Sequence, residues 1–147
     1  MKQMDKILFA NDFSENSEHA FDYALTLAKK FDARLIIIHV INEPVDLRGF
    51  YVPHISFEQL EKEIEQGAEK MMQKFCRTRA KDFTNYETCI VAGTPYEEII
   101  KKAEQEQVSL IVLGTQGRKG IDHFLFGSTA ERVVRTAKCP VMTVRMP

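Results

Sequence analysis

The sequence predicts a three-layer α/β fold of the Rossmann-like type, in which four helices flank a five-stranded parallel sheet of order 3-2-1-4-5. Five short apolar runs alternate along the chain with longer segments of helical periodicity. One run, residues 35–41, is continuous and rich in β-branched side chains, as in a strand covered on both faces. Because crossover connections are right-handed, few topologies remain, and this order places the first and fourth strands side by side. We expect residues 1–147 to form one domain of this kind.

The first half of the chain predicts two strands and two helices. Residues 7–10 form a short buried strand, and apolar positions at helical spacing predict a helix over residues 14–31. The β-branched run at 35–41 is the second strand. Ser56 and Gln59 then resemble a capping box, in which each side chain bonds the backbone amide of the other residue, so a second long helix should begin near Ser56.

The third strand is predicted at residues 86–91, where apolar and polar residues alternate. A clear helix start follows, with Thr94 as the N-cap, Pro95 at the first helical position and Glu97 two residues later. That helix ends before the fourth strand, which is predicted at residues 109–113.

Ser128 is expected to cap the last helix, with Glu131 as the other member of a capping box. Residues 140–144 form the last predicted strand. The one long irregular stretch, residues 42–55, has the length of a lid or binding loop rather than of an ordinary connection.

Composition and charge limit the possible partners. The formal net charge of −1 argues against a broad nucleic-acid surface or a polybasic membrane surface. No apolar run approaches the ~18 residues of a spanning helix, and the first residues lack the pattern of a signal peptide, so we expect a cytoplasmic protein. The three widely spaced cysteines predict reduced thiols, and no cluster of histidine, cysteine and carboxylate residues has metal-ligand spacing.

The most informative segment lies between the fourth strand and the last helix. Its pattern, Gly-x2-Gly-x9-Gly-Ser-Thr, is formed by Gly114, Gly117, Gly127, Ser128 and Thr129. Glycines let the backbone approach an anion without a Cβ, and the first amides of a helix have no intrahelical acceptor. One interpretation is therefore a phosphate-binding cradle, with Asp12 after the first strand at the same topological switch point.

A second interpretation stays open at this point. Glycines after a strand often only form turns, and Ser128 with Glu131 is a sound capping box without any ligand. The segment matches neither the P-loop pattern nor the dinucleotide-binding fingerprint. Because a carboxylate near a phosphate is repelled, we expect Glu131 to turn toward Arg132, Arg135 or solvent if a nucleotide binds.

Taken together, these motifs resemble the universal stress protein family, in particular its ATP-binding subclass. The glycine pattern directly follows the apolar run that ends at Leu113, as in the ATP-binding signature of that family. Further similar segments are residues 11–14, 39–40, 92–95 and 139–141. The resemblance covers essentially the whole chain and implies a Rossmann-like fold of the adenine nucleotide alpha hydrolase-like type.

The resemblance implies ATP, or ADP or AMP, as the ligand, with Mg²⁺ or Mn²⁺ bound through the phosphates. Asp12 and the Val40 backbone would contact the adenosine part, and Leu113 would line the pocket. The ribose and phosphates would be held by Gly114, Gly117, Gly127, Ser128 and Thr129. The family also implies a homodimer formed by antiparallel pairing of the last strands at Val141–Val144.

These implications lead to a nucleotide-dependent regulatory dimer that acts in the stress response, together with an unidentified protein partner. The alternatives are a slow ATP hydrolase and a dimeric interaction module that works without nucleotide. Hydrolysis needs a positioned water, metal ligands and charge stabilisation. Asp12 is the one plausible base or metal ligand in the expected pocket, with His123 a distant second, so we assign no catalytic residues and at most a weak ATPase activity.

Overall fold

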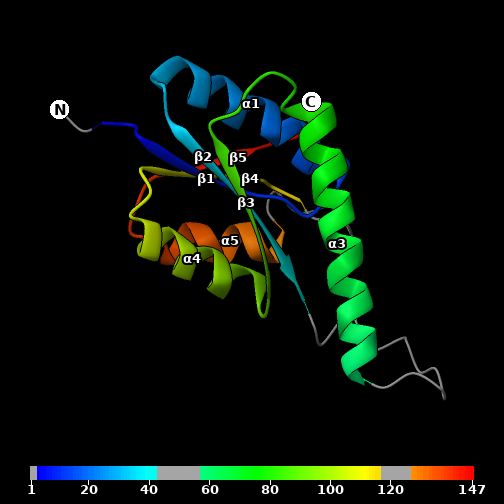
Figure 1. Ribbon diagram of the computed structural model, residues 1–147. Coiled ribbons are helices and arrows are strands. Elements are labelled where there is room, and N and C mark those ends of the chain that lie inside the picture. The colour runs from blue at the N-terminus through cyan, green and yellow to red at the C-terminus, as the bar shows by residue number, and fades with distance from the viewer. Residues whose placement is uncertain (1–2, 43–56, 117–126) are drawn as a thin grey trace.

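The computed structural model describes residues 3–42, 57–116 and 127–147 (Figure 1). Within these ranges, five strands form one sheet of order β3-β2-β1-β4-β5, and every neighbouring pair is parallel. The strands are β1 (Lys6–Ala10), β2 (Arg34–Ile41), β3 (Tyr86–Ala92), β4 (Leu110–Gly114) and β5 (Val141–Val144). The predicted fold class and strand order are confirmed.

Some of the sequence predictions fall outside the described ranges. They concern the cap at Ser56, most of the 42–55 stretch, and the residues Gly117 and His123.

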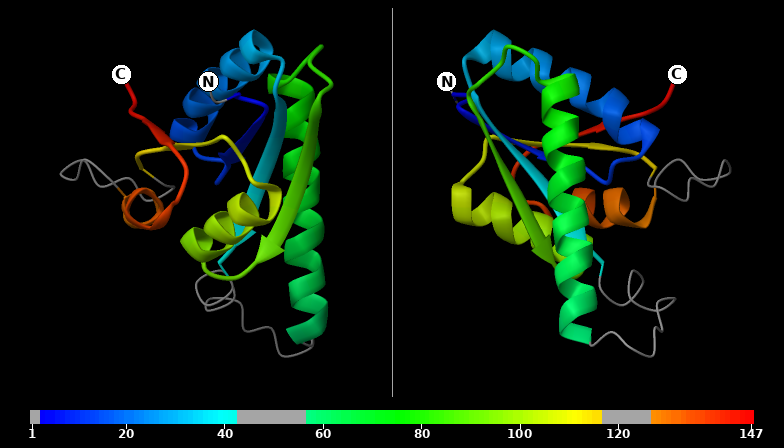
Figure 2. Two further views of the ribbon diagram at one scale, coloured as in Figure 1. Left: turned by 90° about the vertical axis from the view of Figure 1, so that its left-hand side faces the viewer. Right: turned by 45° about the vertical axis from the view of Figure 1, so that its right-hand side comes forward.

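Helices cover both faces of the sheet, which gives the three predicted layers (Figures 1 and 2). On one face lie α1 (Glu15–Phe31) and α3 (Phe57–Arg79), and on the other lie α4 (Pro95–Glu106) and α5 (Ser128–Thr136). None of these helices combines the length and the apolar character that a membrane span needs, within the ranges that the structure describes.

Each face of the sheet has its own apolar core, because successive strand residues point to opposite faces. Phe9 of β1 packs with Phe21 of α1 and Phe75 of α3 on the first face. The ring centroids of Phe21 and Phe75 are 4.9 Å apart, and those of Phe9 and Phe21 are 5.2 Å apart. The neighbouring residue Leu8 points the other way, into the core beneath α4 and α5.

The two halves of α3 differ in burial. The second half buries Ala68, Met72, Phe75 and Cys76. The first half extends past the sheet, as both views in Figure 2 show, and its apolar residues Leu60 and Ile64 are only half-buried. This arrangement leaves space between the start of α3 and the ends of β2 and β3.

The helix starts agree with the prediction at α1 and α4 and differ at α5. Ser14 caps α1, with its hydroxyl accepting from the Ser17 amide at 3.1 Å, and Pro95 opens α4 after Thr94. The predicted capping box of Ser128 and Glu131 is wrong, because Gly127 is the N-cap of α5 and its carbonyl accepts from the Glu131 amide at 3.0 Å. The helix begins at Ser128, as expected, but Ser128 is its first helical residue rather than its cap.

All three cysteines are unpaired, as predicted. Burial raises the pKa of the Cys76 thiol, which lies in the core between α3 and the sheet, and also that of Cys139. Both thiols are therefore held in the protonated form, which is the less reactive one.

Phe75→Ala should lower the free energy of unfolding by about 3 kcal/mol, because a large aromatic side chain in the core is replaced by a cavity. Phe57→Ala on the same helix is the matched control, since Phe57 is 72% exposed whereas Phe75 is 7% exposed. The control should change stability by less than about 0.5 kcal/mol. Urea titration measures both values, and equal losses in the two variants would contradict the described core.

Candidate functional site

The ends of β1 and β4 lie side by side at the centre of the sheet. Phe9 of β1 is in register with Val112 of β4, so the segments that follow the two strands leave the sheet at the same edge. Asp12 follows β1, and Leu113 and Gly114 are the last residues of β4. The Gly127 amide donates to the Thr115 carbonyl, which brings the start of α5 to this edge as well.

The structure thus brings together six of the eight residues predicted for the site. They are Asp12, Leu113, Gly114, Gly127, Ser128 and Thr129, at the carboxyl ends of β1 and β4 and the start of α5. Val40, near the end of β2, is a seventh at the same edge of the sheet. Gly117 lies outside the described residues.

The Val40 backbone faces the space beyond the end of β1. Alternate residues of a parallel strand bond to opposite neighbours. The Ile38 carbonyl accepts from the Asn11 amide, whereas the Ile41 carbonyl accepts from the Gly93 amide on the β3 side. The Val40 amide and carbonyl therefore point to the β1 side, where β1 has already ended at Ala10.

Asp12 belongs to a closed hydrogen-bond network at the start of α1. One carboxylate oxygen, Oδ1, accepts from the Ser14 amide at 2.9 Å and from the Ser17 hydroxyl at 2.7 Å. The Ser17 hydroxyl in turn accepts from the Asp12 amide at 3.1 Å. The network uses Oδ1 and fixes the orientation of a half-buried carboxylate, whose second oxygen takes no part in it.

The His39 side chain contacts the turn that follows β1. Its ring is 3% exposed, as expected for a packed strand residue, and its Nδ1 lies 2.7 Å from the Asn11 carbonyl. Because a carbonyl can only accept, Nδ1 carries a proton. The Phe13 ring lies 4.5 Å from the His39 ring, and Phe13 has a φ of 65°, the left-handed conformation that non-glycine residues seldom adopt.

The start of α5 differs from the start of α1 in its polar groups. Its N-cap, Gly127, has no side chain, and no side chain caps the helix among the residues that the structure describes. The amides of Ser128, Thr129 and Ala130 precede the first intrahelical donor, so they are available to an external acceptor. Glu131 turns its carboxylate toward the next turn, where it pairs with Arg135 at 2.9 Å.

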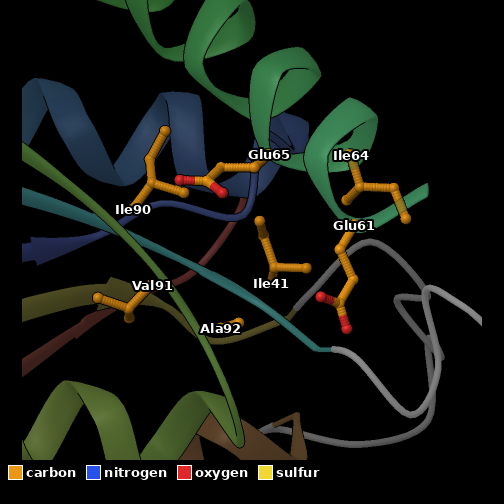
Figure 3. A pocket seen from close by; sticks show the side chains of 7 residues that line it. All are labelled: Ile41, Glu61, Ile64, Glu65, Ile90, Val91 and Ala92. Carbon is orange, nitrogen blue, oxygen red and sulfur yellow. The ribbon is translucent and has the colours of Figure 1, made fainter. Parts of the chain in front are cut away.

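A cavity lies near the same edge of the sheet, and its lining differs chemically from the residues described above. Figure 3 shows this cavity of about 140 Å³ between the first half of α3 and the ends of β2 and β3. Its lining consists of Ile41, Glu61, Ile64, Glu65, Ile90, Val91 and Ala92. Two carboxylates on one wall disfavour a phosphate there. None of the described residues at the start of α5 lines this cavity.

Within residues 3–42, 57–116 and 127–147, no group of three or more histidine, cysteine or carboxylate side chains lies where it could hold a metal ion.

Comparison with known proteins decides the family. A model of the universal stress protein family matches residues 4–145. The chain belongs to this family. The match leaves out only three residues at the start and two at the end, so it includes every strand and helix described above.

Relatives and solved structures agree with this assignment. The universal stress protein YxiE of Bacillus subtilis is 34% identical over 146 residues, which cover 96% of this chain and 99% of the relative. The solved structure of the hypothetical protein MJ0577, from Methanocaldococcus jannaschii, has a TM-score of 0.85 and 28% identity and covers 99% of both chains. A universal stress protein solved in complex with cAMP has a TM-score of 0.69 and 24% identity, covering 97% of this chain and 98% of that one.

Sequence reasoning missed two contacts in this member of the universal stress protein family. One is the bond from His39 to Asn11, which could have been sought because a buried polar side chain in an apolar run needs a partner. The other involves Asn16, whose side chain bonds the segment after β4 and the end of β5. No local pattern signals that contact, since the partners are 100 and 128 residues away.

Ser14→Ala should destabilise the fold by about 1 kcal/mol, because it removes the side-chain acceptor that caps α1. Thr94→Ala is the matched control, since Thr94 is the N-cap of α4 but its side chain makes no cap hydrogen bond. The control should stay within about 0.5 kcal/mol of the unmodified protein. Thermal unfolding followed by circular dichroism measures both, and a loss at Thr94 as large as that at Ser14 would refute the capping role.

Proposed function

We propose that this universal stress protein binds an adenine nucleotide, ATP or its products ADP and AMP, at the carboxyl ends of β1 and β4, and that occupancy regulates a homodimer in the stress response. The observation that carries the proposal is the uncapped start of α5, which lies beside the end of β4 and opposite the ordered carboxylate of Asp12.

The start of α5 suits the phosphates. Its first amides have no intrahelical acceptor, and the helix dipole adds partial positive charge at this end. Gly127 presents no side chain that would keep a phosphate away, and Thr129 lies one residue into the helix with a hydroxyl that can donate. Glu131, the acidic residue of this turn, pairs with Arg135, which reduces its repulsion of a phosphate.

The adenosine part suits the other side of the crevice. The second carboxylate oxygen of Asp12 can accept from ribose hydroxyls while the first keeps its bonds to Ser14 and Ser17. The Val40 amide and carbonyl offer one donor and one acceptor, the pair that the edge of an adenine base needs. Leu113, which is 4% exposed, supplies an apolar wall at the end of β4.

Mg²⁺ or Mn²⁺ would be held chiefly by the phosphate oxygens and waters, as is usual for nucleotide-bound Mg²⁺. Among the described residues, Asp12 is the carboxylate placed to add a protein ligand. When bound, the cation would offset phosphate charge. The universal stress protein solved with cAMP supports a nucleotide as the class of ligand, since its fold covers nearly the whole of this chain.

Dimer formation through β5 has support from the sheet. β5 is an edge strand, and an unpaired edge is a template for another strand. The Pro140 carbonyl accepts from the Ile111 amide and the Val144 carbonyl accepts from the Thr115 amide, both on the β4 side. The backbone groups of Val141 and Thr143 therefore point to the open edge. A second copy of β5 in antiparallel orientation could bond there.

Titration of nucleotide-free protein with ATP, ADP and AMP in the presence of Mg²⁺ should give saturable binding by isothermal calorimetry. Gly127→Val should abolish it, because the branched side chain would occupy the space in front of the first α5 amides. Gly67→Val is the matched control, since a Cβ at Gly67 meets no atom within 4 Å on the exposed face of α3. Gly117→Val, at another glycine of the pattern, should also abolish nucleotide binding.

Absence of heat with millimolar nucleotide would refute nucleotide binding and favour the interaction module that works without it. Binding that Gly127→Val leaves unchanged would refute the site. Phosphate release followed over hours distinguishes a binding protein from a slow ATP hydrolase.

Thr143→Pro should convert the dimer to a monomer in sedimentation velocity, because it removes an amide that points to the open edge and leaves the β4 ladder intact. Thr88→Pro is the matched control in β3, the opposite edge strand, where the Gly93 and Asn85 bonds to β2 show that Thr88 points outward. A dimer that survives Thr143→Pro but not Thr88→Pro would contradict the proposal, because the interface would then lie at β3 rather than at β5.

A further inference from the structure

We propose that Asn16 is a positioning residue that holds residues 115–116, and through Thr115 the Gly127 N-cap of α5, in place for anion binding; this inference rests on the proposed function. Asn16 lies in the first turn of α1 and is 5% exposed. The hydrogen bonds of its side chain go to Val144 and Gln116, and not to Asp12 or the start of α5, so its effect on a nucleotide would pass through other residues.

The Asn16 side chain joins two segments that are distant in sequence. Its Nδ2 donates to the Val144 carbonyl at 3.1 Å, and its Oδ1 accepts from the Gln116 amide at 2.8 Å. The two bonds require the same orientation of the Asn16 amide group, with its nitrogen toward Val144 and its oxygen toward Gln116. A buried amide with both ends bonded is fixed in place.

Gly114 gives this side chain the room it needs. A Cβ on Gly114 would lie 2.5 Å from Oδ1 and 2.7 Å from Cγ of Asn16, closer than nonbonded atoms approach. The absence of a side chain at Gly114 is therefore explained by the packing of Asn16 against the end of β4. The sequence pattern alone attributed this glycine to phosphate binding, and the two roles are compatible because the phosphate would use the backbone.

The two bonds extend into a chain of hydrogen bonds that ends at α5. The Val144 carbonyl also accepts from the Thr115 amide at 3.0 Å, and the Thr115 carbonyl accepts from the Gly127 amide. Asn16 thus links α1, the end of β5 and residues 115–116, and through Thr115 it links the N-cap of α5. Without the Asn16 side chain, the Gln116 backbone amide loses this acceptor and the Val144 carbonyl loses one of its two donors.

A positioning role differs from a purely structural one in its effect on binding. Asn85 provides the comparison, because its side-chain amide also makes two hydrogen bonds, at the opposite end of the sheet and in an exposed position. Its Nδ2 donates to the Ala33 carbonyl at 3.3 Å, and its Oδ1 accepts from Arg34 at 3.3 Å. Removing either side chain should lower the stability of the fold. Only Asn16→Ala should also weaken ATP binding by more than the presence of some unfolded protein explains.

The test is calorimetric titration with ATP and Mg²⁺ of the unmodified protein, Asn16→Ala and Asn85→Ala, at a temperature where all three are folded. We expect Asn16→Ala to weaken ATP binding about tenfold, the scale of one lost hydrogen bond in a buried site. Asn85→Ala should leave the Kd unchanged. In the same samples, hydrogen exchange at the Gln116 amide should accelerate about tenfold or more in Asn16→Ala only. If Asn16→Ala does not fold, Asn16→Ser replaces it, since its hydroxyl is too short to reach both partners.

A double-mutant cycle tests the contact itself without any nucleotide. Gly114→Ala should destabilise the protein because the methyl group overlaps the Asn16 amide. In the Asn16→Ala background the same methyl group enters vacated space, so the two losses should be far from additive. Additive losses would overturn the packing on which the inference depends.

The outcomes separate the two proposals. If the unmodified protein binds no nucleotide, the proposed function fails and the positioning role fails with it. If the unmodified protein binds ATP and Asn16→Ala binds it equally well, the proposed function stands and only the role of Asn16 is overturned.

Discussion

The parallel pairing of β1 with β4 at the centre of the sheet is the constraint on which the rest of the structure depends. It fixes Phe9 beside Val112, and both strands are buried on both faces. Parallel strands end at the same edge, so the segments beginning at Asn11 and Thr115 must leave the sheet together. The phenylalanine core under α1 and α3 and the aliphatic core under α4 and α5 hold this register. A shift of one residue in the pairing of a strand would turn the side chains of each core toward the opposite face of the sheet.

The polar groups at this edge fall into two classes. Around α1 they satisfy one another: Ser14 caps the helix, and Asp12 and Ser17 bond reciprocally. At the start of α5 the amides have no such side-chain cap among the described residues. The acidic cavity with Glu61 and Glu65 lies between the first half of α3 and the ends of β2 and β3. In the proposed function, the α5 amides would face the phosphates and the second carboxylate oxygen of Asp12 would face the ribose hydroxyls.

Gly114 has a packing reason for lacking a side chain, in addition to the phosphate contact that the glycine pattern indicates. The glycine pattern indicated close approach of the backbone to phosphate, whereas the nearest group to its missing Cβ is the Asn16 amide. Membership of the universal stress protein family accounts for the pattern without distinguishing these causes. The contact distances show that the packing of Asn16 alone requires a glycine at this position, and the Asn16 side chain connects Gln116 to β5, the strand at the open edge.

The sequence by itself determined the order and type of the elements, the sheet order and the positions of Asp12, Leu113, Gly114 and the Gly127–Thr129 segment at one edge. Periodicity is local, and the handedness of crossovers restricts how local elements assemble. Only the tertiary structure decided that Gly127 rather than Ser128 caps α5, that Glu131 pairs with Arg135, and that Asn16 spans from α1 to β5. Those features depend on which atoms meet after residues far apart in the chain are packed together. Helix and strand propensity and residue spacing do not predict these tertiary contacts, because they describe each segment alone.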